Sequence, residues 1–511
     1  MTMAPESAPS ADPSGDGSAG AGEFRAPVMR GLLWQFVGRG TWQLSQIVVV
    51  VVLARLLTPH EYGIAGMVLV VISFEPLIAG VGLASALVQR PAITELDKST
   101  VFWTNGAIGL LACLIGIAVS PLVADFYGNA QVEPLFAAVS VVFLLSSLSS
   151  VQANLLVREM DFRAMELRSM AGTLVGAGTA IAIAAEGGGA WALVGQQLAF
   201  YAVSLTLLTG FSRWRPRLMY SRSSLRELRR FGGEVSGTLL MTQLTQNTDN
   251  VLIGRFLGAT ALGLYSFGYS LIMLPVSRIA SPIIQVLYPV FSRVQHDRQR
   301  LASLWLRSLR MMTAVTLPAM LGLIVVAPDM IDVVFGRRWQ HATPVVQLLA
   351  AVGITFGIGE LNGIALQALG RTKLLFRYSC GLFAAGLISF VVGLQWGIVG
   401  VAGCFAAVNL FVQPLYLHLT AQAMGIGLRQ CGQELSGVMQ TTAAAIATAL
   451  LTRELLLADG VPTALRLAAT IAAAAVVYGC ALLWRAPEVV LEIRRLRPRR
   501  RTPAPASVAA G

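Results

Sequence analysis

Long apolar stretches alternate with short polar ones along almost the whole chain. A helix needs about 20 predominantly apolar residues to cross the hydrocarbon core of a membrane, and about fourteen stretches come close to this length. Residues 1–26, in contrast, are rich in Ser, Pro, Gly and Ala, a composition typical of disorder. The pattern predicts an all-α integral membrane protein with both termini on the same side. The predicted spans lie near residues 32–54, 63–84, 101–120, 132–150, 169–185, 189–210, 235–255, 262–282, 309–328, 343–367, 374–393, 399–421, 437–452 and 464–484.

One stretch of the chain occurs twice. Residues 43–63 return 200 positions later as residues 243–263, and each copy predicts a helix that ends at an Arg, a short turn, and a second helix that contains Gly. Six predicted spans separate the copies, so both halves enter the membrane in the same orientation and form a parallel repeat. The identical pairs are Gln43 and Gln243, Leu44 and Leu244, Gln46 and Gln246, Arg55 and Arg255, Leu57 and Leu257, and Gly63 and Gly263.

The repeat predicts how the chain is divided. The expected segments are a disordered tail (1–26), a first lobe of six spans (27–210), a basic linker (211–232), a second lobe of six spans (233–425), two further spans (426–485) and a basic tail (486–511). The linker and the tail concentrate Arg residues, which fix orientation and attract anionic lipid headgroups. A protein partner for the linker is the alternative.

Composition supports a membrane protein. Hydrophobic residues make up 55% of the 511 residues, charged residues make up 13%, and the mean hydropathy is +0.68. Alternating the segments places most of the 38 Lys and Arg residues on one side, which the positive-inside rule identifies as the cytoplasm. The net charge of +12 therefore belongs to cytoplasmic loops, and nucleic acid is not an expected partner. The basic residues of the opposite side are Arg55, Arg255, Arg337, Arg338, Arg453 and Arg466.

The sequence contains no recognisable catalytic or metal-binding pattern. Its five Cys and four His residues are scattered, without the spacing of a metal site or of a Cys/His nucleophile. A Gly-rich phosphate loop, a paired-carboxylate motif and a Ser/His/Asp arrangement are also absent from the sequence. We therefore expect a protein that is not an enzyme and that uses neither a cofactor nor a metal.

Several short stretches, taken in order, resemble one family. In this order and spacing, the chain resembles the polysaccharide flippases of the multidrug/oligosaccharidyl-lipid/polysaccharide exporter superfamily, of the colanic-acid and succinoglycan type. The resemblance covers about residues 31 to 375, and beyond these it is limited to hydropathy. The matching stretches are LLWQFVGRGTWQLSQ, LARLLTPHEYG, FWTNGAIGL, LLVREMDF, QNTDNVLIGRFLGATALGLYSFGYSLIMLP, LYPVFSRVQHD, FGRRWQHATPVVQLLA and ALGRTKL.

The resemblance implies a fold and a cargo. It implies two six-helix lobes around a central cavity that opens alternately to either side of the bacterial cytoplasmic membrane, with both termini in the cytoplasm. The implied cargo is an undecaprenyl-diphosphate-linked oligosaccharide, and polysaccharide polymerase or export machinery is a further implied partner besides the bilayer. The family shares no short motif from which site residues can be carried over.

Other functions stay open at this point. Within the superfamily, a multidrug exporter and a lipid II exporter are alternatives. Drug exporters take cations and should favour acids in the cavity, whereas the intramembrane charges here are three Arg and three acids. A membrane-embedded glycan polymerase or ligase is the alternative from another class. Such an enzyme needs a sizeable outer segment to hold its acceptor, and the longest predicted outer segment, 327–343, is short.

Ionisable side chains inside a membrane are costly, so each one is a candidate for function. Arg39 and Arg377 lie near predicted cytoplasmic helix ends, where they either extend to the surface or line the cavity. Arg278 either anchors the topology or offers paired donors to a diphosphate. Glu75 precedes Pro76 on the second predicted span, and Glu360, in a Gly-rich helix, is either a packed, hydrogen-bonded group or a cavity group.

Asp249, in the second copy of the repeat, is the principal candidate. Asn247, Asp249 and Asn250 stand where the first copy is apolar. At 100° per residue, Gln246 and Asn250 share one stripe of the helix, with Asn247 beside it and Asp249 at its flank. The stripe should face the central cavity, because a carboxylate in lipid costs roughly 2.5–3.5 kcal/mol. Asp249 then contacts sugar hydroxyls or exchanges a proton; the alternative is a structural pairing with Arg255 or with a neighbouring helix.

Overall fold

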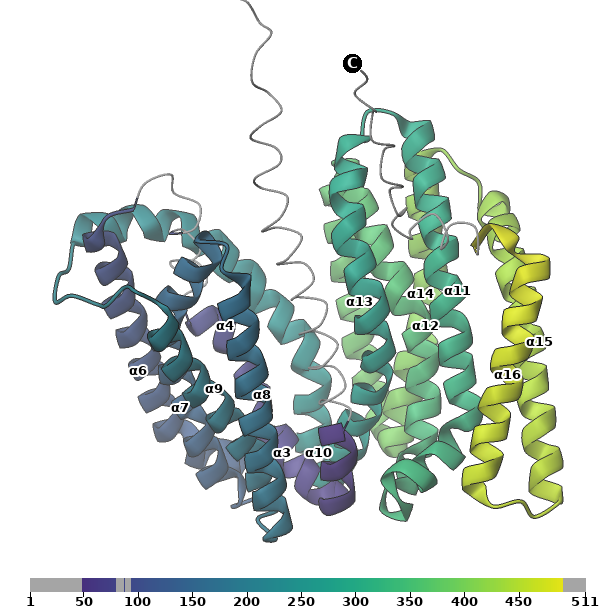
Figure 1. The fold of residues 1–511 in the computed structure, drawn as a ribbon, viewed down its shortest axis with the longest axis horizontal. Coiled ribbons are helices and arrows are strands. Elements are labelled where there is room, and N and C mark those ends of the chain that lie inside the picture. The colour runs from purple at the N-terminus through teal and green to yellow at the C-terminus, as the bar shows by residue number, and fades with distance from the viewer. Residues whose placement is uncertain (1–47, 80–86, 88–92, 490–511) are drawn as a thin grey trace, which may run out of the picture. The chain divides into compact units, whose positions relative to one another are not determined.

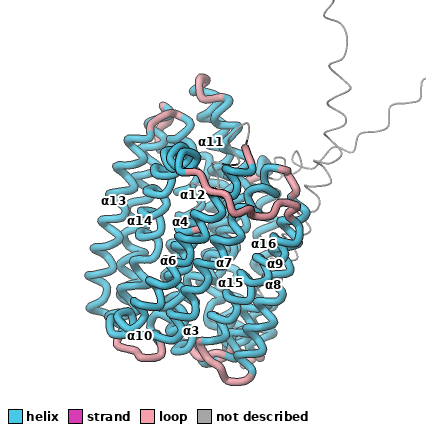
Figure 2. The backbone as a smooth tube through the Cα atoms, turned by 90° about the vertical axis from the view of Figure 1, so that its left-hand side faces the viewer, coloured by secondary structure: helices cyan, strands magenta, loops and turns pink. Residues whose placement is uncertain are grey.

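The computed structural model describes residues 48–79, 87 and 93–489, whose backbone consists of helices joined by loops (Figure 2). The all-α class predicted from the sequence is confirmed for these residues. The chain divides into two compact units. Unit 1 is Met1–Leu53, Val71–Val119 and Phe136–Leu240, and unit 2 is Ala54–Val70, Ser120–Leu135 and Met241–Gly511.

Unit 1 is a bundle whose long helices run alongside one another (Figure 1). Small residues allow this close packing, as is usual between helices in membranes. A Cβ atom built on Gly109 would lie 2.5 Å from the Ser147 side chain, and one on Gly116 would lie 2.2 Å from that of Ser140. The elements are η1 (Val70–Phe74), α4 (Glu75–Ile78), the part of α6 (Glu95–Tyr127) up to Val119, the part of α7 (Val132–Arg158) from Phe136 onward, α8 (Phe162–Ala185), α9 (Trp191–Phe211) and the start of α10 (Arg222–Arg293) up to Leu240.

Unit 2 contains the larger helical bundle and the densest core. Trp305 of α11, Phe291 of α10 and Leu361 of α12 are fully buried in one apolar cluster. The elements are α3 (Pro59–Leu69), the part of α10 (Arg222–Arg293) from residue 241 onward, α11 (Arg298–Met330), η2 (Ile331–Phe335), η3 (Arg337–Ala342), α12 (Thr343–Ala368), α13 (Thr372–Gly393), η4 (Leu394–Trp396), α14 (Gly397–Met424), α15 (Leu428–Ala458) and α16 (Thr463–Arg485).

Both copies of the repeat contain the predicted turn. In the first copy the helix ends just before Thr58, whose side chain accepts a hydrogen bond from the backbone of Glu61 and so caps α3. In the second copy α10 is interrupted at Gly258, where φ is +83°. Glycine adopts such a positive φ without the steric cost that other residues incur. The helix, turn and helix predicted from the repeat are therefore confirmed.

The two copies cross each other through their glycines, inside unit 2. A Cβ atom on Gly63 would lie 1.7 Å from the backbone oxygen of Ala259, and one on Gly263 would lie 1.8 Å from that of Pro59. The contacts are reciprocal, because Gly63 meets Ala259 while Gly263 meets Pro59. The Nδ1 atom of His60 also lies 3.2 Å from Oγ1 of Thr260, its counterpart 200 positions later. The repeat thus has a structural reason: each copy needs a glycine where the other copy's backbone passes.

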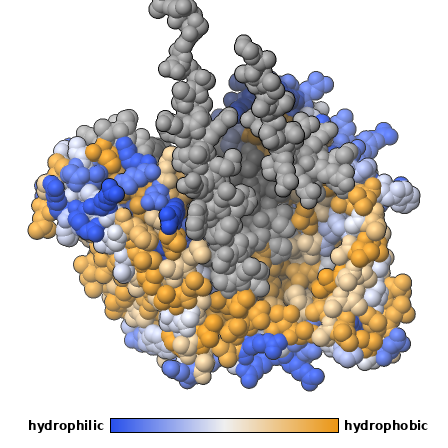
Figure 3. Space-filling model, in the orientation of Figure 1, coloured by the Kyte–Doolittle hydropathy of each residue, from blue (hydrophilic) through white to orange (hydrophobic). Residues whose placement is uncertain are grey.

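The described residues contain eleven helical segments long and apolar enough to cross a membrane. The first predicted span lies mostly outside these residues. Thr372–Met424 comprises two helices, α13 and α14, while Gln246–Leu274 bends at Gly258. On the face drawn in Figure 3, hydrophobic residues cover the middle of the helices and hydrophilic ones gather near their ends. The chain is a multi-pass membrane protein, whereas the total of fourteen spans stays a prediction.

Several helices are longer than predicted. Helix α10 begins at Arg222, inside the segment 211–232 that the sequence indicated as a loop, and α11 and α15 begin at Arg298 and Leu428. These predicted bounds were wrong because hydropathy marks only the part of a helix that lies in lipid. Polar caps set the true ends: the Asp297 side chain accepts a hydrogen bond from the backbone of Arg300 at the start of α11.

The predicted outer segment 327–343 is also mostly helical. It holds the end of α11, the π-helix η2 and the 3₁₀-helix η3. Arg55 donates hydrogen bonds of 2.7 and 2.5 Å to the backbone oxygens of Val334 and Val333 at the end of η2. These carbonyls lack partners within the helix, so the Arg of the first copy serves as a C-terminal cap.

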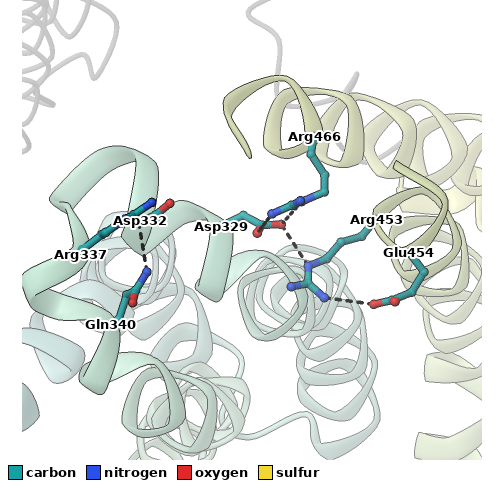
Figure 4. Close-up of polar contacts among 7 residues, drawn as sticks. All are labelled: Asp329, Asp332, Arg337, Gln340, Arg453, Glu454 and Arg466. Atoms are coloured by element: carbon teal, nitrogen blue, oxygen red, sulfur yellow. Dashed lines mark hydrogen bonds and ion pairs between the residues drawn. The ribbon is translucent and has the colours of Figure 1, made fainter. Parts of the chain in front are cut away.

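An ion-pair cluster attaches α15 and α16 to α11 (Figure 4). The Asp329 carboxylate is buried at the end of α11, where Arg466 of α16 donates to it at 2.6 and 3.1 Å and Arg453 of α15 donates at 3.0 Å. Arg453 also pairs with Glu454 at 3.2 Å. Paired guanidinium donors hold a carboxylate in a fixed geometry. The last two helices are therefore anchored at this end by directed bonds as well as by apolar packing.

Candidate functional site: two internal pockets that contain carboxylates

Asp249 lies buried in the interior of unit 2, with only 7% of its surface exposed. The Tyr265 hydroxyl donates a hydrogen bond of 3.0 Å to one carboxylate oxygen, and the backbone N–H of Asn250 donates one of 2.8 Å to the other. Tyr265 belongs to the part of α10 that follows the bend at Gly258, so the bend brings acid and hydroxyl together. Among the contacts that the structure describes, the partner of the carboxylate is a hydroxyl rather than a cation.

Arg255, the alternative partner predicted for Asp249, lies elsewhere. It is exposed, and its guanidinium carbon lies 5.6 Å from the centre of the Phe126 ring. A contact of this kind is a cation–π interaction. Of the two predicted structural partners, the neighbouring helical segment is therefore the one that contacts Asp249.

The polar neighbours of Asp249 have different environments. The amide of Asn247 donates to the backbone oxygen of Gln243 at 2.8 Å, and the Ser266 hydroxyl lies 3.4 Å from the amide oxygen of Asn250. Gln246 is exposed. The predicted stripe is therefore polar along its length, and it passes from an exposed residue to the buried carboxylate.

Asp249 lines a pocket of about 280 Å³ between α10, α12, α13 and α14. Most of its wall is aromatic or aliphatic, and its polar groups come from α10, from Ser379 and from Asn409. Such a cavity, apolar with a few placed polar groups, is typical of a ligand site. The lining residues include Gln246, Thr248, Asp249, Tyr269, Phe356, Ser379, Phe383, Phe390, Phe405 and Asn409.

Glu75 lines a second pocket, of about 190 Å³, inside unit 1. Its carboxyl group faces the hydroxyls of Ser146 and Tyr201 and the guanidinium of Arg168. Arg168 also lies 3.1 Å from the hydroxyl of Ser169. Glu75 is therefore both a hydrogen-bonded group and a cavity group.

The two pockets occupy corresponding places in the repeat. The pocket at Glu75 involves α7, α8 and α9, which match the fourth, fifth and sixth predicted spans of the first lobe. The pocket at Asp249 involves α12, α13 and α14, which match the same three spans of the second lobe. Three corresponding spans of each half therefore line its pocket, but the carboxylates come from different spans, Glu75 from the second span of its lobe and Asp249 from the first.

Two other predicted residues lie outside these pockets. Glu360 and Arg377 are exposed and line neither of them. Arg278 lies in α10, at a position where only the backbone is described, and Arg39 lies outside the described residues.

Sequence reasoning missed Arg168, the basic partner of Glu75. It was assigned to a cytoplasmic loop because the predicted span began at 169, whereas α8 begins at Phe162. The signal was present in the N-cap at Asp161, whose side chain accepts a hydrogen bond from the backbone of Ala164. Reading that cap would have placed Arg168 on the second turn of a helix.

Both pockets contain groups that are capable of ligand binding and of proton exchange. Each combines a carboxylate with hydroxyl or amide groups, which can bind sugar hydroxyls or exchange protons. Within residues 48–79 and 93–489, no group of three or more His, Cys, Asp or Glu side chains is arranged to hold a metal ion.

Comparison with known families assigns the chain. Residues 52–344 match a family described as "Polysaccharide biosynthesis protein". This segment is more than half of the chain, and the chain belongs to this family.

Similar proteins come from several bacteria. The chain is 27% identical to "Lipopolysaccharide biosynthesis protein WzxC" of Escherichia coli, with 80% of this chain and 84% of WzxC covered. It is 26% identical to "Teichuronic acid biosynthesis protein TuaB" of Bacillus subtilis, with 92% of this chain and 98% of TuaB covered. It is 33% identical to "Succinoglycan biosynthesis transport protein ExoT" of Rhizobium meliloti, with 63% of this chain and 65% of ExoT covered.

Solved structures share the fold at low sequence identity. "Lipid II flippase MurJ, inward closed conformation" superposes with a TM-score of 0.74 at 13% identity, over 90% of this chain and all of MurJ. An inward-facing multidrug resistance transporter of the MATE family superposes with a TM-score of 0.60 at 14% identity, over 75% of this chain and 94% of the transporter. The fold is therefore the one that these superfamily members share.

Proposed function

We propose that the chain moves oligosaccharide repeat units, linked to undecaprenyl diphosphate, from the inner to the outer leaflet of the bacterial cytoplasmic membrane. The observation that carries this proposal is the family match over residues 52–344, together with relatives named for the biosynthesis of three different envelope polysaccharides. Because those polymers differ chemically, a transport step explains a function shared by these relatives better than a reaction specific for one sugar does. ExoT is named a transport protein.

The proposed architecture has fourteen spans in two six-helix lobes, 27–210 and 233–425, around a central cavity. The linker 211–232, both termini and the tail 486–511 face the cytoplasm, and residues 426–485 form the last two spans. The even number of spans in each lobe and the positive-inside bias support this arrangement. The reciprocal crossing at Gly63 and Gly263 supports a parallel repeat.

The proposed path includes the polar stripe of α10. Asp249 is its functional carboxylate, which contacts sugar hydroxyls or exchanges a proton as the cavity changes sides. Gln246, Asn247 and Asn250 extend the stripe from this carboxylate. The burial of Asp249 in a pocket beside exposed Gln246 supports this role.

The remaining charges are proposed to act at the rim of the path. Arg39, Arg278 and Arg377 offer paired donors that suit a diphosphate. Glu360 is proposed to line the path, and Glu75 to hold the pocket of the first lobe with Arg168.

A multidrug exporter is the second candidate, favoured by the MATE-type fold. A lipid II exporter is the third, favoured by the fold shared with MurJ. Both fold matches have identities of 13–14%, so they support the architecture only. The proposal for the cargo therefore rests on the family match.

Deletion of the gene tests the transport proposal in cells. Surface polysaccharide should be lost while lipid-linked repeat units accumulate facing the cytoplasm, because synthesis continues and transfer stops. The measurement is the accessibility of those units to a membrane-impermeant sugar-oxidising reagent, in intact cells and in inverted vesicles. Units that accumulate unpolymerised in the outer leaflet would instead identify a polymerase, and unchanged surface polysaccharide with new drug sensitivity would identify a drug exporter.

A further inference from the structure

Unit 2 contains another pocket, which is distinct from the pocket at Asp249. It has a volume of about 750 Å³ and lies between α11, α15 and the C-terminal end of α16. Small-molecule sites typically have volumes of about 300–1,000 Å³. The start of α11, the start of α15 and the end of α16 all lie on the side predicted to face the cytoplasm, which is where a lipid-linked substrate would arrive.

Two helices turn polar faces toward this pocket. On α15 the lining residues include Gln430, Gln433, Glu434 and Gln440, which recur at the spacing of one helical face. From Gln430 to Gln440 the face extends over ten residues, or about 15 Å along the helix axis. The glutamines are exposed to the pocket rather than packed in the core. Because the predicted span begins at residue 437, most of this face lies on the cytoplasmic side of the hydrocarbon core, where the hydrophilic part of a lipid-linked substrate would be.

The facing residues of α11 complete the site. Gln299, Ser303 and Arg310 lie on one face of α11, at intervals of four and seven residues. Amide and hydroxyl groups act as both donors and acceptors, as the hydroxyl groups of a sugar also do. The pocket thus offers a three-turn polar surface on one helix and a second polar surface opposite it.

The charges at the pocket compensate one another. Arg310 is only 8% exposed and pairs with Glu434 at 2.8 Å and with Glu488. Arg485 adds one further cation, so the lining contains two Arg and two Glu. A diphosphate would call for an excess of cations. The lining lacks that excess, and its amides and hydroxyls suit an uncharged, hydroxyl-rich ligand.

We propose that this pocket, formed by α11, α15 and the end of α16, binds the glycan part of the lipid-linked substrate before the substrate enters the transport path. The inference rests on the proposed function, which supplies the identity of the ligand as a glycan. The lining of the pocket supplies the evidence that the ligand is uncharged and rich in hydroxyl groups. Arg310 is a positioning residue that holds Glu434 and Glu488 in place at the wall.

Site-specific photocrosslinking tests the inference in the full-length protein reconstituted in nanodiscs. The photoreactive residue p-benzoylphenylalanine replaces Gln433, which lines the pocket, or Met439, an exposed residue of the same helix that does not line it. The probe is the lipid-linked oligosaccharide fraction of the producing cells, labelled by growth on radioactive glucose. Labelling at 433 should exceed labelling at 439 several-fold. Excess water-soluble oligosaccharide, released from the same lipid by mild acid, should abolish the difference, and undecaprenyl phosphate should not.

Two results would overturn the inference. Equal labelling at both positions would show that the pocket does not select the substrate. Competition by undecaprenyl phosphate or phospholipid, without competition by the released oligosaccharide, would identify a headgroup site. Transport of the same labelled lipid by the unsubstituted protein is measured in parallel in liposomes. Transport without selective labelling at 433 would refute glycan binding in this pocket and leave the proposed function intact. An absence of transport would refute the proposed function, and the labelling would then decide separately whether the pocket binds the glycan.

Discussion

Replacing Asp249 by Asn should largely abolish polysaccharide export while the protein reaches the membrane at its normal level. Asn keeps the size of the side chain and can still accept the hydrogen bond from Tyr265, so the local packing is preserved. The substitution removes the charge and the exchangeable proton, and it replaces the oxygen that accepts the hydrogen bond from the Asn250 backbone by an NH2 group. The measurement is cell-surface polysaccharide per amount of membrane-embedded protein.

Tyr265→Phe is the matched control for this variant. It removes the 3.0 Å hydrogen bond to Asp249 but leaves the carboxylate in place. The loss of one intramolecular hydrogen bond costs about 1 kcal/mol, so most export should remain. Full export by Asp249→Asn would contradict a role for the charge. Disappearance of the Asp249→Asn protein from the membrane would show that the carboxylate has a structural role instead.

Replacing Gly63 by Ala should strongly destabilise the protein, although the change adds only one methyl group. The new Cβ would lie 1.7 Å from the backbone oxygen of Ala259, which cannot move aside as a flexible side chain does. Overpacking of this kind typically costs about 1–3 kcal/mol, and more where a backbone must shift. We expect a lower midpoint of thermal unfolding in detergent. Gly263→Ala should have a similar effect, because its Cβ would lie 1.8 Å from the oxygen of Pro59.

Gly322→Ala supplies the comparison on α11. A Cβ atom there would have no neighbour within 4 Å, and Ala favours a helix over Gly by about 1 kcal/mol. This variant should therefore be as stable as the original protein or more stable. The double variant at 63 and 263 should lose less stability than the sum of the single variants, since either methyl group forces the same crossing apart. A Gly63→Ala protein with the stability of Gly322→Ala would refute the reciprocal crossing.

The repeat and the helical class were predictable from the sequence because they depend on local patterns. Apolar runs report where a helix is in lipid, and identities 200 positions apart report that two segments have the same local structure. The bounds of α11 and α15 were not predictable in this way, since each helix continues into water where hydropathy gives no signal. Polar caps such as Asp297 mark the true start.

The candidate site was predictable only in part. The depth of Asp249 in a helix follows from the match of its segment to the apolar stretch of the first copy, and its polar character is unusual there. Its partner, Tyr265, lies beyond the bend at Gly258, and the contact depends on how the chain folds back at that glycine. The meeting of Glu75 with Arg168 and Tyr201 depends on packing among four helices, which a sequence pattern along one helix does not specify.

The central claim is that the chain transfers a lipid-linked oligosaccharide between leaflets without changing it chemically. Its most direct test uses the purified protein in liposomes that contain the radiolabelled lipid-linked oligosaccharide of the producing cells. An enzyme that cleaves the sugar is added outside, and the fraction of lipid that becomes accessible is followed with time. The account predicts that the inner-leaflet half becomes accessible only in liposomes that contain the protein, and that the glycan keeps its length in parallel liposomes without the cleaving enzyme. Accessibility limited to the outer half, or a lengthened glycan, would contradict it.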